Sequence, residues 1–432
     1  MSSILFSIRS KGMGKYLRRG QAILNNYGLT PSKMMQALDL FSRTLGEFQC
    51  GATFPITAIT VERNGKMVQE YMARGIEFAI HGYRHIDHSQ LSPQEQLAHL
   101  RRARNVFDAA GIPVSGFRAP YLQFNQAVYA AAQAAGLAYS SNQPILWDVL
   151  AGESVSPAGQ AAYRRAIAFY QPWSASQQPS LPCLKDQLVE IPVSLPDDEI
   201  LLDRLQGEAR GLAARVWSRI LAESHRRQEL FTLQLHPERI ARCAPAVAQL
   251  LAEARALDPP VWIARLAEIA AWWRALSQAT VAVTYSDSGE PRLSLQGPPG
   301  AAFLIRNLAV DAPACPWARG YQRSQASELV LKTRLRPWIG VPVSAPQELT
   351  SFLKQQGYIV QISDRTQDYS IYIDQTGPVP IDKRALLDRI ETSDKPLVKL
   401  ARWPNGAGSA LTVTGDIDAL TIWDFGLRYL GH

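Results

Sequence analysis

Short apolar runs alternate with longer amphipathic stretches over residues 30–275 of the chain. The apolar runs, for example 52–58 and 76–80, have the length of buried strands. The stretches between such runs, for example 31–48 and 92–111, repeat apolar residues at the spacing of one helix face. This alternation is typical of parallel strands joined by crossover helices, so it predicts either a (β/α) barrel or a doubly wound sheet.

The pattern changes character near residue 280. Before that point we expect further strands at 114–117, 137–149, 188–195 and 230–235, and further helices at 64–74, 125–136, 238–256 and 262–276. After it, turn residues separate predicted strands at 280–285, 291–296, 302–308, 330–335 and 358–363, with helices only at 346–357 and 382–392. The last segment returns to an apolar strand, LTVTGDIDAL, followed by an amphipathic helix ending at Tyr429. We therefore expect a region of βα units in residues 1–279, an α+β domain in 280–400, and a C-terminal strand and helix in 401–432.

Composition and charge exclude several classes of function. An apolar fraction of 47% in 432 residues supports a sizeable core. The formal net charge is +7, but the basic residues are scattered, and no zinc-finger or helix-turn-helix spacing is visible. We therefore expect no nucleic-acid partner. No stretch approaches the roughly 20 apolar residues that a membrane helix needs, so we expect no transmembrane segment.

The cysteines and the N-terminal segment bear on the cellular compartment. Cys50, Cys183, Cys243 and Cys315 lie far apart without CxxC pairing, which is typical of neither a disulfide framework nor a structural zinc site. A reducing compartment is the simplest interpretation. The apolar stretch before Arg9 is too short for the core of a signal peptide. These features predict a cytoplasmic protein, and they leave its oligomeric state open.

Two histidines four residues apart follow a predicted strand in the segment IEFAIHGYRHIDHS. Both His81 and His85 can reach one point at the carboxyl end of this strand, which is where the active sites of barrels lie. Two imidazoles at this spacing suit a divalent transition metal such as zinc. On spacing alone, ordinary polar residues of a loop remain an alternative. His88 is a third imidazole nearby, and we interpret it as a bystander.

The motifs around these histidines resemble the NodB-homology polysaccharide deacetylases, family 4 of the carbohydrate esterases. In that family an ATFF strand, a helix, a G-H-E-I strand and H-S/T-x-x-H follow one another, and the stretch from ATFPITAI to HGYRH is similar, with Gly82 at the Ser/Thr position. GFRAPY, at 116–121, resembles the family's R-x-P-Y/W motif, and LQLHP, at 233–237, resembles its Leu-x-His motif. The resemblance covers residues 30–275 and implies a distorted (β/α) barrel.

The resemblance also implies roles for individual residues. His236 matches the family's general acid, and Arg118 matches the arginine that steadies the catalytic aspartate. Tyr121 is expected to line the substrate groove, where its backbone can offer an oxyanion donor. Trp147 loosely resembles the family's tryptophan, which makes it a candidate substrate contact, and Asp148 beside it is a candidate partner of the site. The alternatives are a helix-start histidine at position 236 and a plain surface arginine at position 118.

One family feature is missing from its expected place. Before the ATFF-like strand the family has T-F-D-D, whose first aspartate is the base and whose second binds metal, whereas residues 1–50 contain only Asp39. Near the C-terminus, ALTVTGDIDAL is an apolar strand followed by Asp416 and Asp418. We expect a circular permutation in which this strand supplies the first strand of the barrel, with Asp416 as base and Asp418 as metal ligand. A surface turn that caps the next helix is the alternative.

These residues together predict a metal-dependent hydrolase that removes an N-acyl group, in the first instance acetyl, from a sugar or glycan precursor. His81, His85 and Asp418 would hold the divalent metal, most simply Zn2+, with Co2+ or Ni2+ as alternatives. Two rival functions are an amidase or deformylase acting on another C–N substrate, and an inactive glycan-binding protein. Asp197 and Asp198 follow another predicted strand, where they either bond the substrate or belong to a solvated loop.

Overall fold

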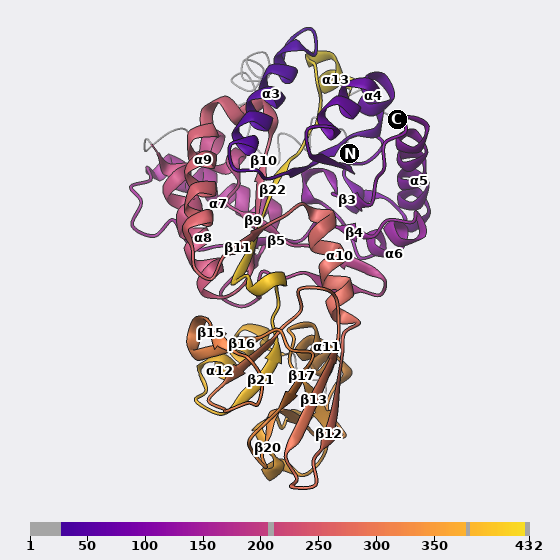
Figure 1. The fold of residues 1–432 in the computed structure, drawn as a ribbon. Coiled ribbons are helices and arrows are strands. Elements are labelled where there is room, and N and C mark those ends of the chain that lie inside the picture. Colours follow the sequence, from indigo (N-terminus) through magenta and orange to yellow (C-terminus); the bar gives the residue numbers. More distant parts are fainter. Residues whose placement is uncertain (1–26, 206–210, 377–380, 428–432) are drawn as a thin grey trace.

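The computed structural model describes residues 27–205, 211–376 and 381–427. The apolar N-terminal stretch and the predicted helix end at Tyr429 lie outside the described residues. Two lobes are visible, a larger one built around a long curled sheet and a smaller one below it (Figure 1). No helix among the described residues is both long enough and apolar enough to cross a membrane.

A twelve-stranded sheet forms the centre of the larger lobe within the described residues. Its strands are β1 (Ala52–Ile56), β2 (Ile76–Ile80), β3 (Gly116–Phe117), β4 (Tyr139–Ser140), β5 (Pro144–Leu146), β6 (Trp173–Ser174), β7 (Cys183–Lys185), β8 (Leu188–Glu190), β9 (Val193–Leu195), β10 (Leu230–Leu235), β11 (Val261–Ile263) and β22 (Ser409–Gly415). They are ordered β6-β5-β9-β10-β22-β1-β2-β3-β4-β8-β7, with β11 beside β22. Apart from β7, they run parallel to their neighbours. The predicted (β/α) fold is therefore confirmed, in the form of a curled sheet typical of a distorted barrel.

The strand β22 comes from the C-terminal end of the chain and lies in the middle of this sheet. It pairs with β10 from Leu230 opposite Ala410 to Leu235 opposite Gly415. On its other side Thr53 of β1 faces Thr414. All seven residues of β22 are buried, as expected of a strand with neighbours on both edges. The C-terminal strand thus lies beside the apolar run at 52–58, where the sequence predicted it.

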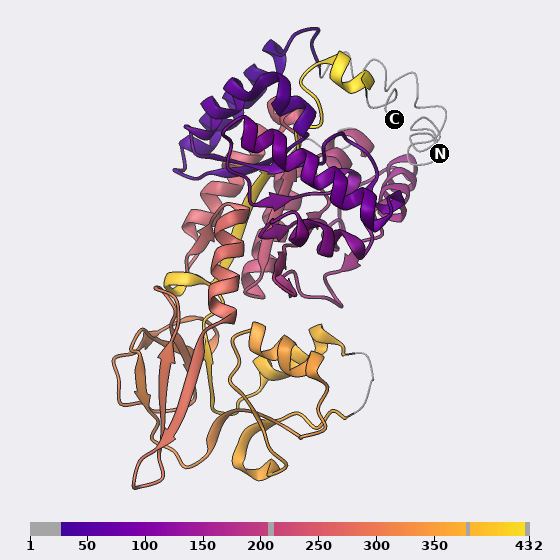
Figure 2. The ribbon, with the colours of Figure 1, turned by 90° about the vertical axis from the view of Figure 1, so that its right-hand side faces the viewer.

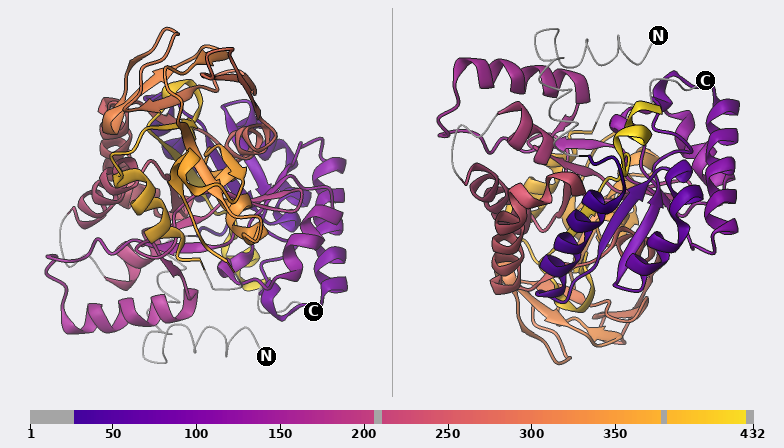
Figure 3. Two further views of the ribbon diagram at one scale, coloured as in Figure 1. Left: turned by 90° about the horizontal axis from the view of Figure 1, so that it is seen from below. Right: turned by 90° about the horizontal axis from the view of Figure 1, so that it is seen from above.

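Helices surround the curled sheet, with α4–α6 on one side of the lobe and α7–α9 on the other (Figure 3). They are α3 (Ser32–Gly46), α4 (Ala58–Met72), α5 (Pro93–Ala109), α6 (Ala127–Ala134), α7 (Pro157–Tyr170), α8 (Leu212–Arg226), α9 (Ile240–Ala256) and α10 (Leu266–Ser277). Each turns an apolar stripe inward. In α5, for example, a capping box between Ser92 and Glu95 fixes the start, and Leu100 and Phe107 are buried. The helix predicted at 262–276 starts later, because its first residues form β11 instead.

Within the described residues, the smaller lobe contains three short sheets and two α-helices. Its strands are β12 (Thr280–Tyr285), β13 (Pro291–Gln296), β14 (Phe303–Arg306), β15 (Cys315–Pro316), β16 (Tyr321–Ser324), β17 (Glu328–Val330), β18 (Arg336–Val341), β19 (Val360–Ile362), β20 (Tyr369–Tyr372) and β21 (Leu397–Leu400), and its helices are α11 (Gln347–Gln355) and α12 (Lys383–Thr392). The prediction of a strand at 330–335 was wrong. A turn occupies this stretch, in which the Thr333 hydroxyl accepts a hydrogen bond from the Leu335 amide.

The two lobes meet at the amino ends of the central strands (Figure 2). Arg384 of α12 forms a buried two-point ion pair with Glu229, the residue before β10. The Trp403 indole donates to the Gln228 carbonyl at 3.0 Å. The chain passes to the smaller lobe through α10 and returns through β21 to β22. The smaller lobe therefore packs against the end of the sheet opposite to the carboxyl ends of the strands.

Candidate active site

Polar side chains follow several neighbouring strands of the large sheet at their carboxyl ends. His81 comes directly after β2, Arg118 after β3, and His236 after β10. Asp416 and Asp418 follow β22. Because β10, β22, β1, β2 and β3 are parallel, their carboxyl ends meet at one edge of the sheet. This topology gathers residues that are more than 300 positions apart in the sequence.

Two histidines and one aspartate form the first cluster at this edge. The Nε2 atom of His81 lies 3.3 Å from Oδ1 of Asp418, and Nε2 of His85 lies 3.1 Å from the same oxygen. The ligand atoms of all three side chains lie within 4.8 Å of one another. The two rings are buried, and the aspartate is partly exposed. Three donors thus converge, with the carboxylate on the side open to solvent.

The geometry of this cluster fits a small divalent cation. Zinc binds imidazole nitrogen and carboxylate oxygen at about 2.0–2.2 Å, so two ligands at tetrahedral angles lie about 3.4 Å apart. The separations of 3.1 and 3.3 Å are close to this value. Two imidazoles and one carboxylate leave a position for water or substrate, as in catalytic zinc sites. His81, His85 and Asp418 are therefore suited to hold such an ion.

The orientation of His81 is fixed by the backbone of a neighbouring strand. Its Nδ1 atom lies 2.9 Å from the Arg118 carbonyl oxygen. Since a carbonyl oxygen only accepts, the hydrogen sits on Nδ1 and the lone pair on Nε2. A metal ligand needs that lone pair, and such outer contacts commonly orient ligating histidines.

Gly82 allows the tight turn between the two histidines. Its φ is +79°, a conformation that L residues rarely adopt. A Cβ atom at this position would lie 2.7 Å from the Arg84 carbonyl oxygen. The departure from the Ser/Thr of the family motif therefore has a local cause, because this turn excludes a side chain.

A second cluster holds the Asp416 carboxylate. Arg118 Nη1 donates to Oδ1 at 2.8 Å, and Gln234 Nε2 donates to Oδ2 at 2.8 Å. The same guanidinium donates to the Thr414 hydroxyl, to the Ser141 carbonyl oxygen and to the Ser141 hydroxyl. Arg118 has no exposed surface, and Asp416 is 2% exposed. This buried ion pair holds the carboxylate in one orientation.

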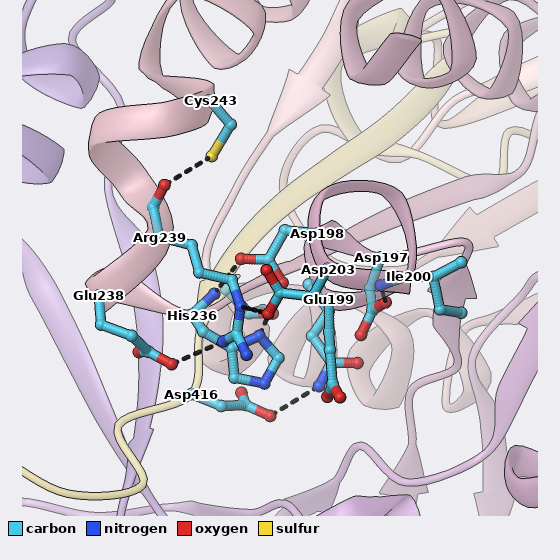
Figure 4. Close-up of polar contacts among 12 residues, drawn as sticks. Asp197, Asp198, Glu199, Ile200, Asp203, His236, Glu238, Arg239, Cys243 and Asp416 are labelled. Carbon is cyan, nitrogen blue, oxygen red and sulfur yellow. Dashed lines mark hydrogen bonds and ion pairs between the residues drawn. The ribbon is translucent and has the colours of Figure 1, made fainter. Parts of the chain in front are cut away.

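A third cluster pairs His236 with Asp198 (Figure 4). Asp198 accepts from His236 twice, at 2.7 Å from Nδ1 and at 2.7 Å from the backbone amide. Burial works against the charged imidazole, but the Asp198 carboxylate outweighs burial and holds the pKa of His236 well above its ordinary value. The Nδ1 hydrogen is committed to Asp198, so Nε2 carries the proton that can be donated.

A segment of the chain matches a known family. Residues 34–140 match the family model described as polysaccharide deacetylase. These residues are homologous to the polysaccharide deacetylases. The match includes His81, His85, Arg118 and Tyr121, and the resemblance inferred from the motifs is confirmed over this segment.

Similar folds occur among solved structures, whereas no curated protein matches the chain. A Mycobacterium smegmatis protein assigned as a polysaccharide deacetylase is 22% identical; the match covers 55% of this chain and 77% of that one, with a TM-score of 0.42. A Pseudomonas aeruginosa PAO1 protein with the same assignment is 18% identical, with coverages of 56% and 72% and a TM-score of 0.40. Puue allantoinase is 16% identical, with coverages of 55% and 72% and a TM-score of 0.41.

Two residues expected to contact substrate differ in their surroundings. Tyr121, within the deacetylase-homologous segment, has a φ of +61° and packs its ring edge-on against His85, with 4.3 Å between ring centroids. It therefore lies beside the metal-site candidate. Trp147 is 1% exposed, and its indole donates to the Ser194 hydroxyl at 3.2 Å. The prediction of Trp147 as a substrate contact does not fit this core position. Asp148 is exposed and is not part of the three clusters.

The sequence reasoning missed the partners that hold the site together. It named Asp148 as a candidate partner of the site, and it left Asp197 and Asp198, after another predicted strand, as either substrate contacts or part of a solvated loop. Asp198 is fully buried against His236, 38 positions away. Gln234 was quoted only as part of LQLHP. The sequence does indicate that Asp198 and Gln234 lie at or near strand ends. It does not indicate which residues they pair with, because that depends on which strands are neighbours.

Proposed function

We propose that the protein is a metal-dependent hydrolase that removes an N-acyl group, in the first instance acetyl, from a sugar or glycan precursor. One observation carries the proposal. A possible metal-binding trio, an arginine-held carboxylate and an aspartate-held imidazole lie together at the carboxyl ends of adjacent strands. Hydrolysis of an amide needs these three functions, which are polarisation of the carbonyl, removal of a proton from water, and protonation of the leaving amine.

Each cluster takes one role in this proposal. His81, His85 and Asp418 hold the ion, with Zn2+ as the first candidate and Co2+ or Ni2+ as alternatives. When bound, the metal polarises the acyl carbonyl and lowers the pKa of water. Asp416 accepts the proton of the attacking water, in an orientation that Arg118 maintains.

The leaving amine receives its proton from His236. The raised pKa of this imidazole keeps it charged near neutral pH, so it is in the acidic form when the C–N bond breaks. Tyr121 lies against His85 and is positioned to line the substrate groove. The substrate is a carbohydrate in this proposal, and a cytoplasmic location is supported by the four cysteines, all of which are free thiols.

We also infer that the chain is a circular permutation of the deacetylase barrel. The family's aspartate-bearing strand precedes the ATFF strand, whereas Asp416 and Asp418 follow a strand near the C-terminus. The position of β22 between β10 and β1 supports this inference, because a parallel neighbour of β1 presents its carboxyl end at the same edge. The smaller lobe then lies within the permuted order, between α10 and β22.

Metal content and turnover test the proposal together. We expect about one divalent metal per purified chain by elemental analysis, and loss of most of it in His81→Ala and Asp418→Asn, because the loss of one ligand weakens such sites strongly. Asp148→Asn, which changes an exposed carboxylate, is the matched control and should retain the metal.

Turnover is measured on a panel of N-acetylated sugars, formylated amines and cyclic amides. We expect release of acetate from a sugar, and a decrease of roughly 10²- to 10⁴-fold in His236→Gln with the metal retained. Release of product only from non-sugar amides would favour an amidase or deformylase. Full metal content without any hydrolysis would favour an inactive glycan-binding protein, and full metal content in both ligand variants would exclude the assigned trio.

A further inference from the structure

A second carboxylate lies beside the His236–Asp198 pair. Asp197 and Asp198 follow β9, and neither has exposed surface. One oxygen of each and a ring nitrogen of His236 lie within 4.8 Å of one another. Asp197 Oδ1 accepts from the Ile200 amide at 2.9 Å, whereas Oδ2 is buried without a hydrogen-bond partner among the described residues (Figure 4). A capping role explains one oxygen of Asp197 and leaves the other unexplained.

The titratable groups around Asp197 come from several elements. Asp198 precedes the π-helix η4 (Glu199–Arg204), which contributes Glu199 and Arg204, while Tyr170 ends α7 and His236 follows β10. Around His236 itself the further charges are Glu238 and Arg239, and these two bind each other at 2.6 Å. Glu199 likewise pairs with Arg204 at 2.9 Å. Arg204 and Arg239 also act on the two aspartates through their charges, but His236 is the positive group that hydrogen-bonds to Asp198 directly.

Two adjacent carboxylates and one imidazole form a coupled system. Burial is the largest influence on Asp197, and the Asp198 carboxylate adds to it, so the pKa of Asp197 is raised to about 7 although the charge of His236 acts in the opposite direction. Coupling is reciprocal: if the charge of His236 favours ionised Asp197, then ionised Asp197 favours charged His236 by the same free energy.

We propose that Asp197 is a positioning residue for the acid His236. Its carboxylate and that of Asp198 together hold His236 in the charged form. The proposal rests on the role of His236 in the proposed function. Asp198 holds His236 through two hydrogen bonds, one to the ring Nδ1 and one to the backbone amide. Asp197 adds a negative charge without touching Nε2, the ring nitrogen that donates the proton. Each residue thus contributes separately, one to orientation and the other to charge.

The sign of the effect on pH dependence follows from this arrangement. Below about pH 7, Asp197 carries a proton and Asp198 alone faces His236 with a full charge. As the pH rises, Asp197 ionises, and the second negative charge keeps the proton on His236 to higher pH. The acid therefore remains charged over a wider range than a single carboxylate would allow.

The test is a nitrogen-15 NMR titration of the histidine rings in the metal-loaded full chain, with the His236 signal assigned by its loss in His236→Gln. In Asp197→Asn, which keeps an oxygen for the Ile200 amide, we expect the pKa of His236 to fall by roughly one pH unit or more. Asp148→Asn, which removes an exposed carboxylate outside this cluster, is the control, and the His236 titration should stay unchanged.

A second variant separates charge from capping. Asp197→Ala removes both the charge and the cap, so it should lower the pKa of His236 as much as Asp197→Asn does and also lower the melting temperature. An unchanged His236 titration in Asp197→Asn overturns the proposal, as does a shift that occurs only in Asp197→Ala.

The NMR readout does not depend on turnover. If no substrate is hydrolysed, the proposed function fails while the titration still decides the coupling. If turnover is found, the alkaline limb of kcat against pH should move to lower pH in Asp197→Asn, with KM unchanged. An alkaline limb at the parental position would contradict the role of Asp197.

Discussion

Arg118 shows how a single residue can serve both the stability and the chemistry of the site. Its guanidinium is fully buried, which is costly unless each donor finds an acceptor. Those acceptors are the Asp416 carboxylate, the Thr414 hydroxyl and two oxygens of Ser141. These hydrogen bonds connect the ends of β3, β4 and β22 beside the candidate catalytic carboxylate. The same contacts that orient Asp416 should also contribute to the folded state.

Arg118→Met should therefore destabilise the fold strongly. Asp416 would remain buried with Gln234 as its one side-chain donor in the described part of the chain, and removal of one partner of a buried pair typically costs about 3–5 kcal/mol. Urea unfolding followed by tryptophan fluorescence gives the change. Arg74→Met is the control, since Arg74 is half exposed and pairs with Asp39 at the surface, which is worth less than about 1 kcal/mol. Equal losses in both variants would contradict the importance assigned to the buried pair.

Gly82 makes a second prediction at the residue scale. Gly82→Ser restores the residue type of the family motif, but it places a Cβ atom against the Arg84 carbonyl at a positive φ. We expect a loss of about 1–3 kcal/mol in unfolding free energy and weaker metal retention, because the turn carries both histidines. Gly46→Ser, whose Cβ would meet no atom within 4 Å, is the matched control. A Gly82→Ser variant as stable as the control would show that the turn adapts.

The sequence predicted individual site residues better than their partners. HGYRH and FRAP are local signals, so His81, His85 and Arg118 could be found from a few neighbouring letters. The carboxylate that pairs with His236 could not, because PDDE is an ordinary loop sequence and its position opposite His236 depends on the pairing of β9 with β10. Trp147 was misplaced for a similar reason, since sequence alone does not show which side of the sheet a side chain faces.

At the scale of elements, the continuous apolar strands and most long helices were predicted well, whereas two long helices and the short strands were missed or misjudged. The helix expected at 92–111 is α5, and the strand expected at 76–80 is β2 with the same bounds. By contrast, α7 and α8 were not predicted, although α8 has a clear apolar stripe. The strand expected at 137–149 is two short strands with a turn between them. Such strands are stabilised by their neighbours in the sheet, which the local pattern does not contain.

The strand β22 should be essential for stability because it lies between β10 and β1. Leu411→Ala removes a fully buried side chain and should lower the unfolding free energy by about 2–5 kcal/mol, whereas metal content per folded chain should be unchanged. Val343→Ala, at an apolar residue that is 71% exposed, is the control and should have little effect. Chemical denaturation together with elemental analysis distinguishes the two contributions. A marginal effect of Leu411→Ala would mean that the sheet does not depend on packing around this strand.

At the scale of the whole molecule, the strand that precedes two candidate site residues follows the smaller lobe in the chain. The chain leaves the larger lobe through α10 and returns through β21 directly into β22. The position of Asp416 and Asp418 therefore depends on how firmly the two lobes are joined. The join includes the Arg384–Glu229 pair, the indole hydrogen bonds at the amino ends of the strands, and an apolar cluster in which Trp273 of α10 packs against Trp403. The lobes should accordingly unfold as one cooperative unit.

Calorimetry of Arg384→Met tests this coupling. The Glu229 side chain is 1% exposed and, among the residues that the structure describes, would retain only the Ser180 amide as a donor, so the loss of its buried partner should cost about 3–5 kcal/mol. We expect one transition in the parent and a lower, broader or split transition in the variant, because the smaller lobe can then open while the larger one stays folded. The double variant Arg384→Met with Glu229→Gln removes the unpaired charge and should recover part of the loss. Two separate transitions already present in the parent would show that the lobes fold independently, and β22 would then be held by its neighbours in the sheet alone.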